Sequence, residues 1–270
     1  MPAVASETPA QSPTRSEHDE LRSHLIETLD GVPLEREPFC HIYMENIFPA
    51  ATYRKMLLNM PPKELYTALN LRKWALSDGT STRDQLYLTS ENLMKLPPQS
   101  AALWRTVVQA VSDGALKRAL FAKLAPDLAA RFGVSEDCVP DINCVCDVLL
   151  VRDTEDYRIK PHPDGLNKLV TMQFYLPGDE GQLDLGTSLF IRHRGLLGSS
   201  FEEVKRFPFK PNSAYAFAVS ESAKRTSWHG REKLTGFTGV RNTMMVLFQQ
   251  LSSAQPAKKK SARWRVGSAR

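Results

Sequence analysis

The chain has 270 residues, of which 42% are hydrophobic and 24% charged, a composition typical of a folded protein with a sizeable core. Its formal charge of +5 comes from the last thirteen residues, which hold six basic residues and no acid; the remainder has one more acidic than basic residue. This balance excludes a basic nucleic-acid-binding body, and we expect the tail to be solvated, with at most a weak contact to nucleic acid or anionic lipid. No apolar run is long enough to cross a membrane, and the N-terminus lacks the apolar segment of a secretory signal, so the expected location is cytoplasmic.

The polarity of the chain divides it into three parts. Residues 1–20 are rich in Ser, Thr, Pro, Ala and Glu and are predicted to be a disordered leader. Residues 21–252 are predicted to form a single domain, with a helical N-terminal part at 21–137 and a β-rich core at 138–252. The basic tail at 253–270 is predicted to be disordered. The four cysteines lack the paired spacing of a zinc site and indicate free thiols in a reducing compartment.

The helical part begins with a strand-like segment at His41–Met44, and Pro49 then precedes a predicted helix at Ala50–Asn59. Further helical patterns cover residues 63–75 and 101–132, the second with interruptions near Asp113-Gly114 and Pro126. After residue 140, short β-rich runs alternate with turn residues, at 144–151, 168–176, 187–192, 214–219 and 243–249. Strands at this spacing predict a sandwich or jelly roll with helices packed outside it, a mainly β or α+β fold.

One predicted strand alternates clearly between polar and apolar residues. Thr171, Gln173 and Tyr175 share one face, whereas the other face is continuously apolar, with Val170, Met172, Phe174 and Leu176. We expect the polar face to line a cavity and the apolar face to pack on the helices. The alternative is an ordinary strand whose polar face meets water.

The tripeptide His162-Pro163-Asp164 offers an imidazole and a carboxylate two positions apart, which can bind one metal from adjacent positions. A remote histidine would complete the two-histidine, one-carboxylate triad of non-haem Fe(II), which leaves three positions open. His193 lies between two arginines, whose charges oppose a dication. His229 instead precedes the strand that begins near Arg241, so we favour His229 as the third ligand.

Arg241 and Thr243 lie on one face of their predicted strand. A guanidinium can grip a carboxylate through two parallel hydrogen bonds, and a nearby hydroxyl can add a third. With Tyr175 contributed from a facing sheet, these residues predict a site for a dicarboxylic acid. The alternative is a surface arginine at a strand start.

Taken together, these motifs resemble the Fe(II)/2-oxoglutarate-dependent oxygenase superfamily in its prolyl-hydroxylase-like branch. The resemblance covers roughly residues 38–250, and its elements are His162-Pro-Asp164, Thr171 to Pro177, Trp228-His229-Gly230 and Arg241-Asn-Thr243. It implies a double-stranded β-helix (jelly roll) flanked by N-terminal helices. It also implies Fe(II) on His162, Asp164 and His229, and 2-oxoglutarate with its distal carboxylate on Arg241 and Tyr175, assisted by Thr243.

The resemblance further implies a dioxygenase that uses O2 and 2-oxoglutarate to hydroxylate a C–H bond, releasing succinate and CO2. Asp164 favours hydroxylation, because related halogenases lack this carboxylate. We expect Arg152, Gln173 and Trp228 near the substrate, which favours a small polar metabolite, an amino acid, a sugar or a peptide. The chain departs from the family pattern before the first ligand, where a tyrosine is usual and Arg152 and Tyr157 occur instead. It departs again at Leu185–Phe190, which replaces a stretch that resembles Gly-Gly-Glu.

Two other functions are consistent with the same residues. One is a catalytically silent jelly-roll module that binds a ligand such as a sugar. The other is a cupin-type metal isomerase, which is less favoured because cupin ligands usually cluster as several histidines in one short motif.

Overall fold

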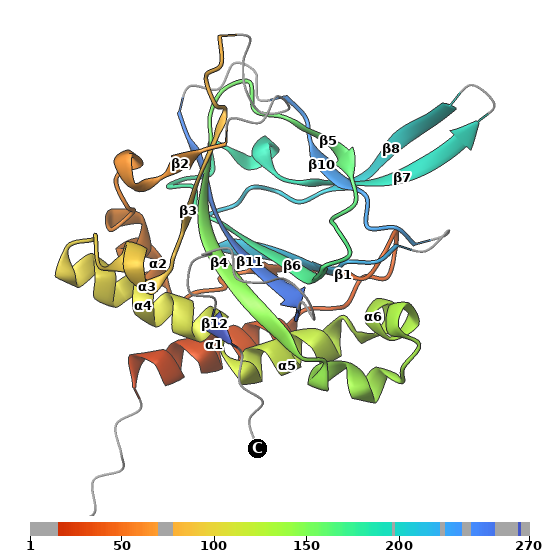
Figure 1. Ribbon diagram of the computed structural model, residues 1–270, viewed down its shortest axis with the longest axis horizontal. Coiled ribbons are helices and arrows are strands. Elements are labelled where there is room, and N and C mark those ends of the chain that lie inside the picture. The colour runs from red at the N-terminus through yellow and green to blue at the C-terminus, as the bar shows by residue number, and fades with distance from the viewer. Residues whose placement is uncertain are drawn as a thin grey trace, which may run out of the picture.

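The computed structural model describes residues 16–69, 78–195, 198–221, 225–233, 239–251 and 264–265. Most of its helices form a layer on one face of a large antiparallel sheet (Figure 1). They are α1 (Glu17–Gly31), α2 (Ala50–Leu58), α3 (Ser90–Leu93), α4 (Pro98–Val111), α5 (Gly114–Lys123) and α6 (Ala125–Phe132), with short 3-10 turns at Lys63–Leu65, Glu136–Asp141 and Leu183–Leu185. None of the helices in these ranges is long and apolar enough to span a membrane.

The large sheet has the strand order β1-β9-β6-β11-β4-β3-β2, and β12 pairs with β4 beside this path. Its strands are β1 (His41–Glu45), β2 (Thr67–Ala68), β3 (Arg83–Tyr87), β4 (Cys144–Asp153), β6 (Lys168–Tyr175), β9 (Ser213–Ala218), β11 (Arg241–Gln250) and β12 (Trp264–Arg265). The central strand β11 pairs along almost its whole length with both β4 and β6.

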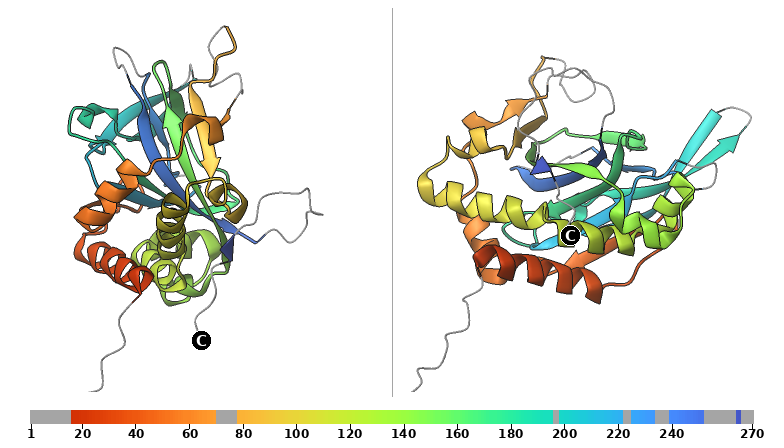
Figure 2. Two further views of the ribbon diagram at one scale, coloured as in Figure 1. Left: turned by 90° about the vertical axis from the view of Figure 1, so that its left-hand side faces the viewer. Right: turned by 60° about the horizontal axis from the view of Figure 1, so that its bottom comes forward.

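A smaller antiparallel sheet has the order β5-β10-β7-β8. It consists of β5 (Ile159–His162), β7 (Ser188–Gly195), β8 (Gly198–Arg206) and β10 (His229–Arg231). This sheet lies on the side of the large sheet that faces away from the helices, and the β7–β8 hairpin projects from the body (Figures 1 and 2). The two sheets thus enclose a space whose walls carry the candidate site.

The apolar face of β6 packs on the helical layer, as the alternation predicts. Val170, Met172, Phe174 and Leu176 belong to the main core together with the buried side chains of the helices. Across the same core, the ring of Phe121 on α5 meets that of Phe248 on β11 edge to face at 5.5 Å. The opposite face of β6 is buried as well, with Thr171 2% and Gln173 4% exposed, so it does not meet water.

The helix α1 begins earlier than expected, inside the stretch predicted to be the disordered leader. Ser16 caps it by accepting a hydrogen bond from the backbone N–H of Asp19 at 3.2 Å, and acidic residues occupy the first turn. Leu21, Leu25 and Leu29 recur at helical spacing and are buried. Residues 17–20 are therefore helical, and residues 1–15 of the predicted leader lie outside the described part of the chain.

Two further predictions differ from the structure. The helix expected over 63–75 is replaced by a 3-10 turn followed by β2, because the backbone there pairs with β3; residues 70–77 lie outside the described ranges. The tail predicted to be disordered contains β12, which pairs with β4, and the rest of 252–270 lies outside the described ranges. The strand expected at His41–Met44 is β1, which joins the large sheet together with β2 and β3, two strands that were not predicted.

Candidate metal centre and its cavity

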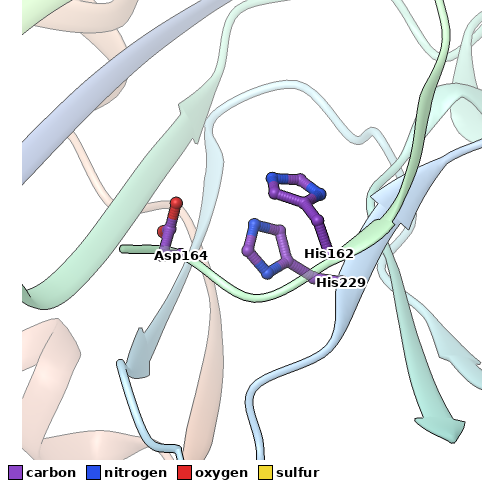
Figure 3. Close-up of side chains that lie close together, drawn as sticks. All are labelled: His162, Asp164 and His229. Carbon is purple, nitrogen blue, oxygen red and sulfur yellow. The ribbon is translucent and has the colours of Figure 1, made fainter. Parts of the chain in front are cut away.

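Three side chains that the sequence singles out meet between the two sheets. His162 ends β5, Asp164 follows it by two residues, and His229 begins β10, directly opposite His162 in the β5–β10 pairing. One ligand atom from each lies within 4.8 Å of the others, a group that could hold a metal ion (Figure 3). The two imidazole rings are 4.5 Å apart between centroids.

Backbone carbonyls orient both histidines. The Nδ1 atom of His162 lies 3.0 Å from the carbonyl oxygen of Lys160, and that of His229 lies 2.9 Å from the carbonyl oxygen of Ser227. A carbonyl only accepts, so each Nδ1 carries the hydrogen and each Nε2 keeps its lone pair. This is the arrangement that prepares a histidine to bind a metal through Nε2.

Burial keeps the imidazoles neutral. It lowers the pKa of His162 to about 4, with His229 adding to the effect, and it also lowers the pKa of His229. At neutral pH both rings therefore offer a lone pair to a cation.

Asp164 is ionised and held by two donors. The Nζ of Lys168 donates to Oδ1 at 2.5 Å, and the hydroxyl of Thr171 donates to Oδ2 at 2.6 Å. Burial alone would raise the pKa of Asp164, but His229, Lys168 and Thr171 outweigh it and lower the pKa to about 2. Lys168 and Thr171 were not predicted in this role, although both lie on the strand that follows the motif.

The triad opens into a cavity of about 180 Å³ between the sheets. A cavity of this size suits a small molecule. The cavity is lined by Arg83, Tyr157, Ile159, His162, Asp164, Lys168, Thr171, Gln173, Thr187, Tyr215, His229, Gly230, Arg231, Arg241 and Met245.

Arg241 is buried in the wall of this cavity, with 2% of its surface exposed. Its Nη1 donates to Oδ2 of Asp153 at 2.8 Å and its Nε to the carbonyl oxygen of Leu185 at 2.6 Å. The same Asp153 carboxylate also accepts two hydrogen bonds from Arg83. Two arginines that line the cavity thus share one buried carboxylate, which itself does not line it.

Tyr175 and Thr243 lie near Arg241, but not in the way the sequence suggests. They are cross-strand partners on β6 and β11, so Tyr175 comes from the same sheet as Arg241 and not from a facing sheet. The Tyr175 hydroxyl accepts the backbone N–H of Thr187 at 2.9 Å, and its ring centroid is 5.5 Å from the guanidinium carbon of Arg241. The Thr243 hydroxyl accepts from Nε2 of Gln173 at 2.9 Å.

Of the three residues predicted to be near the substrate, only Gln173 lines the cavity. The guanidinium of Arg152 lies over the ring of Tyr66 at 5.4 Å, because Arg152 points to the opposite face of β4 from Asp153. Trp228 packs on Phe201 of the projecting hairpin, with ring centroids 4.9 Å apart. His193 lies on the same hairpin, 2.7 Å from Glu202, so it does not join the triad.

Two cations that were not predicted to belong to the site, Arg83 and Arg231, also line the cavity. Arg231 follows His229 by two residues on β10, so strand alternation alone places both on one face. That signal was present in the sequence. The sequence contains no such signal for Arg83, because the position of Arg83 beside Asp153 depends on the pairing of β3 with β4.

No family model matches the chain, and no curated protein matches it. Among solved structures, it is similar to dioxygenase for auxin oxidation 1 from Arabidopsis thaliana, in a binary complex with 2-oxoglutarate. That match covers 90% of this chain and 92% of the other, with 11% identity and a TM-score of 0.53. A prolyl hydroxylase from Trichoplax adhaerens in complex with a peptide fragment of hypoxia inducible factor matches at 9% identity and a TM-score of 0.49, covering 87% and 91% of the two chains. A prolyl-4-hydroxylase from Pseudomonas putida matches at 10% identity and a TM-score of 0.48, and the match covers 86% of this chain and 99% of the other.

At these identities the likeness concerns the fold, and the first of the three comparisons carries it. The mixed helix and sheet architecture expected from the sequence is confirmed, and it is the architecture of a dioxygenase that binds 2-oxoglutarate.

Proposed function

We propose that the protein is an Fe(II)- and 2-oxoglutarate-dependent dioxygenase that hydroxylates a C–H bond of its substrate. The observation that carries the proposal is the meeting of His162, Asp164 and His229 at one end of a cavity lined by arginines. The likeness in fold to a dioxygenase that binds 2-oxoglutarate supports it. On this proposal the two facing sheets are the jelly-roll core of the fold.

The donor set suits Fe(II). Two neutral imidazoles and one carboxylate form the facial triad of non-haem iron and leave coordination positions open. The buried Nε2 atoms are held in place by the backbone contacts of Nδ1, and Asp164 is ionised and oriented by Thr171 and Lys168. When bound, the iron would supply the activation of O2 that is coupled to decarboxylation of 2-oxoglutarate to succinate and CO2.

The cavity suits a dianionic cosubstrate. Four cations line it, Arg83, Lys168, Arg231 and Arg241, whereas only Asp164 among the lining residues is acidic. We place 2-oxoglutarate against Arg241, whose predicted companions Tyr175 and Thr243 are fully buried and do not line the cavity. The role of the chain is then to orient this acid and to exclude water, while Gln173 faces the space left for substrate.

The substrate we propose is a small polar metabolite, an amino acid, a sugar or a peptide, because most residues that line the cavity are charged or polar. All four cysteines are free thiols, three of them buried, which suits the reducing cytoplasm in which we place the protein. Arg152 and Trp228 no longer belong to the proposed substrate site.

The proposal is tested by adding Fe(II) and 2-oxoglutarate to the protein without oxygen. We expect a weak visible charge-transfer band, and succinate should form when air and a metabolite extract are added. His229→Ala should give neither. A product that forms with the wild type and not with this variant identifies the substrate.

If the wild type shows no band and makes no succinate, the oxygenase proposal is wrong and the chain is a silent binding module of this fold. Metal binding without a 2-oxoglutarate response would favour the metal isomerase instead.

A further inference from the structure

Lys168 is a partly buried cation that acts on all three members of the proposed triad. Its Nζ donates to Oδ1 of Asp164 at 2.5 Å, and 21% of its side chain is exposed. Its positive charge also contributes to the lowered pKa values of His162 and His229. Because the ligand atoms of the triad lie within 4.8 Å of one another, the ammonium group lies close to the position that a metal ion would take.

The two donors to Asp164 differ in charge. The hydroxyl of Thr171 donates to Oδ2, whereas the ammonium group of Lys168 donates to Oδ1. An ionised carboxylate has about four lone-pair sites, so a neutral donor can keep its hydrogen bond while the carboxylate binds a metal ion. An ammonium group is instead repelled by a dication, twice as strongly as by a unit charge at the same distance. Thr171 therefore supports a metal ion on Asp164, and Lys168 opposes one.

The backbone of Lys168 is fixed, so its side chain alone is free to move. Its N–H donates to the carbonyl oxygen of Gly165 at 2.9 Å, and its carbonyl oxygen accepts from Nη1 of Arg131 at 2.7 Å. Arg131 also donates to the carbonyl oxygens of Val219 and Leu166, which ties this turn to the end of β9. The flexible four-carbon stem of a lysine lets the ammonium group leave a carboxylate while the backbone stays in place.

The cavity wall gives this ammonium group no second carboxylate. Asp164 is the only acidic residue among those that line the cavity. The other cations of the lining are Arg83, Arg231 and Arg241, which repel the ammonium group. When Lys168 leaves Asp164, we therefore expect its ammonium group to move toward water.

We propose that Lys168 is a positioning residue that competes with the metal ion for Asp164 and thereby sets the metal affinity. The inference rests on the proposed metal site and adds a control of its affinity. Without metal, Lys168 neutralises the buried carboxylate; a metal ion that binds there displaces it. Removing one partner of a buried ion pair leaves an uncompensated charge, which the metal ion alone would then neutralise.

The first measurement is the affinity of the protein for Mn(II), by competition with a chromogenic chelator. Lys168→Met removes the charge and keeps an unbranched side chain, and it should bind Mn(II) about 10- to 100-fold more tightly, the range for a hydrogen bond to a charged group. Lys168→Arg keeps a cation and should stay within about threefold of the wild type. If Lys168 merely supported the carboxylate, as Thr171 does, Lys168→Met would instead bind Mn(II) more weakly.

Lys233→Met is the matched control for the loss of one positive charge. Lys233 pairs with Asp156 at 2.7 Å, and neither residue lines the cavity. This substitution should leave the affinity for Mn(II) unchanged.

The second measurement follows the displacement in the wild type. Mass spectrometry of peptides gives the rate at which an amine-acylating reagent modifies Lys168, and this rate should rise when Mn(II) is added, because the ammonium group leaves Asp164 for water. In His229→Ala the same addition should leave the rate unchanged.

Unchanged or weaker binding of Mn(II) by Lys168→Met would overturn the inference, as would a labelling rate of Lys168 that does not respond to Mn(II). The labelling needs no substitution at Lys168, so it decides even if Lys168→Met does not fold. If neither the wild type nor Lys168→Met binds Mn(II), the result is a different one, because it refutes the metal site and with it the proposed function.

Discussion

At the scale of single residues, burial keeps His162, one of the three proposed metal ligands, neutral. Burial lowers its pKa to about 4, whereas an unfolded histidine has a pKa of about 6.5. The folded state therefore binds fewer protons than the unfolded state between these two values. The contribution of neutral His162 to the free energy of unfolding is fully present above about pH 6.5 and is lost as the pH falls toward about 4.

We predict that His162→Gln flattens the pH dependence of the unfolding free energy of the metal-free protein between pH 6.5 and 4. The difference between the two unfolding free energies should change by roughly 3 kcal/mol over this window, because burial lowers the pKa of His162 from about 6.5 to about 4. Denaturant unfolding at a series of pH values, with a chelator present, measures it. Parallel curves for wild type and variant would contradict the prediction. A contribution from Asp164 belongs below about pH 4, because its own pKa is lowered to about 2.

The hydroxyl of Thr171 supports Asp164, the proposed carboxylate ligand. Its hydroxyl fixes Oδ2 of Asp164 at 2.6 Å from a fully buried position on β6. Thr171→Val keeps the shape and removes the donor, and we expect metal affinity to fall by about 10-fold, at the lower end of the effect of losing such a supporting contact. Competition with a chromogenic chelator measures the affinity. Thr106→Val, on α4 in the helical layer, is the matched control, and an equal effect of both substitutions would show that Asp164 does not need Thr171.

At the scale of elements, the site depends on how closely β10 approaches β5. A Cβ added at Gly230 would lie 2.8 Å from the carbonyl oxygen of Ile159 and 3.1 Å from the nitrogen of Pro161. Both contacts are with backbone, so the strands would have to separate. These strands carry His229 and His162, and the absence of a side chain at Gly230 therefore permits the short distance between the two proposed histidine ligands.

We predict that Gly230→Ala lowers metal affinity by about 10-fold or more while costing roughly 1–3 kcal/mol of stability, as overpacking does. Chelator competition and denaturant unfolding measure the two effects separately. Gly31→Ala at the end of α1 has open space around the new Cβ and should change neither quantity appreciably. Unaltered metal binding in Gly230→Ala would mean that the strand spacing does not matter to the ligands.

The elements that the sequence predicts are those with strong periodicity. The strands now seen as β4, β6, β9 and β11 were expected within two residues of their observed bounds, because their apolar runs are long. The strand β5 escaped prediction, because it is only four residues long, contains Pro161 and lies at a sheet edge, where proline is tolerated. The strand β8, which pairs with β7 in the projecting hairpin, is almost entirely exposed, so it lacks the buried apolar face by which a strand is predicted.

At the scale of the whole molecule, the cavity is assembled by pairings that no local pattern encodes. Asp153 meets Arg83 because β3 joins β4 across a separation of 70 residues, and β1 joins β9 from the other end of the domain. The sequence could therefore indicate the triad, whose members lie in short motifs, but could not indicate the shared carboxylate behind Arg241. It also placed Tyr175 on the wrong sheet, since neighbouring strands need not be consecutive in the chain.

A site built between two sheets couples ligand binding to the stability of the whole fold. A ligand that binds only the folded state adds about 2.7 kcal/mol at a concentration 100 times its Kd. Neither proposed site exists in the unfolded chain, because His162 and His229 come together only when β5 and β10 pair, and Arg241 meets Asp153 only when β11 pairs with β4.

We therefore predict that Mn(II) and 2-oxoglutarate, each at about 100 times its Kd, together raise the thermal midpoint by at least about 5–10 °C, which follows from the shift expected for a domain of this length. Differential scanning calorimetry measures it. In His229→Ala the same additions should leave the midpoint within about 1–2 °C of the ligand-free value, because an incomplete triad no longer holds the metal. A full shift in that variant would contradict the prediction, since it would mean that the stabilising ion binds away from β10.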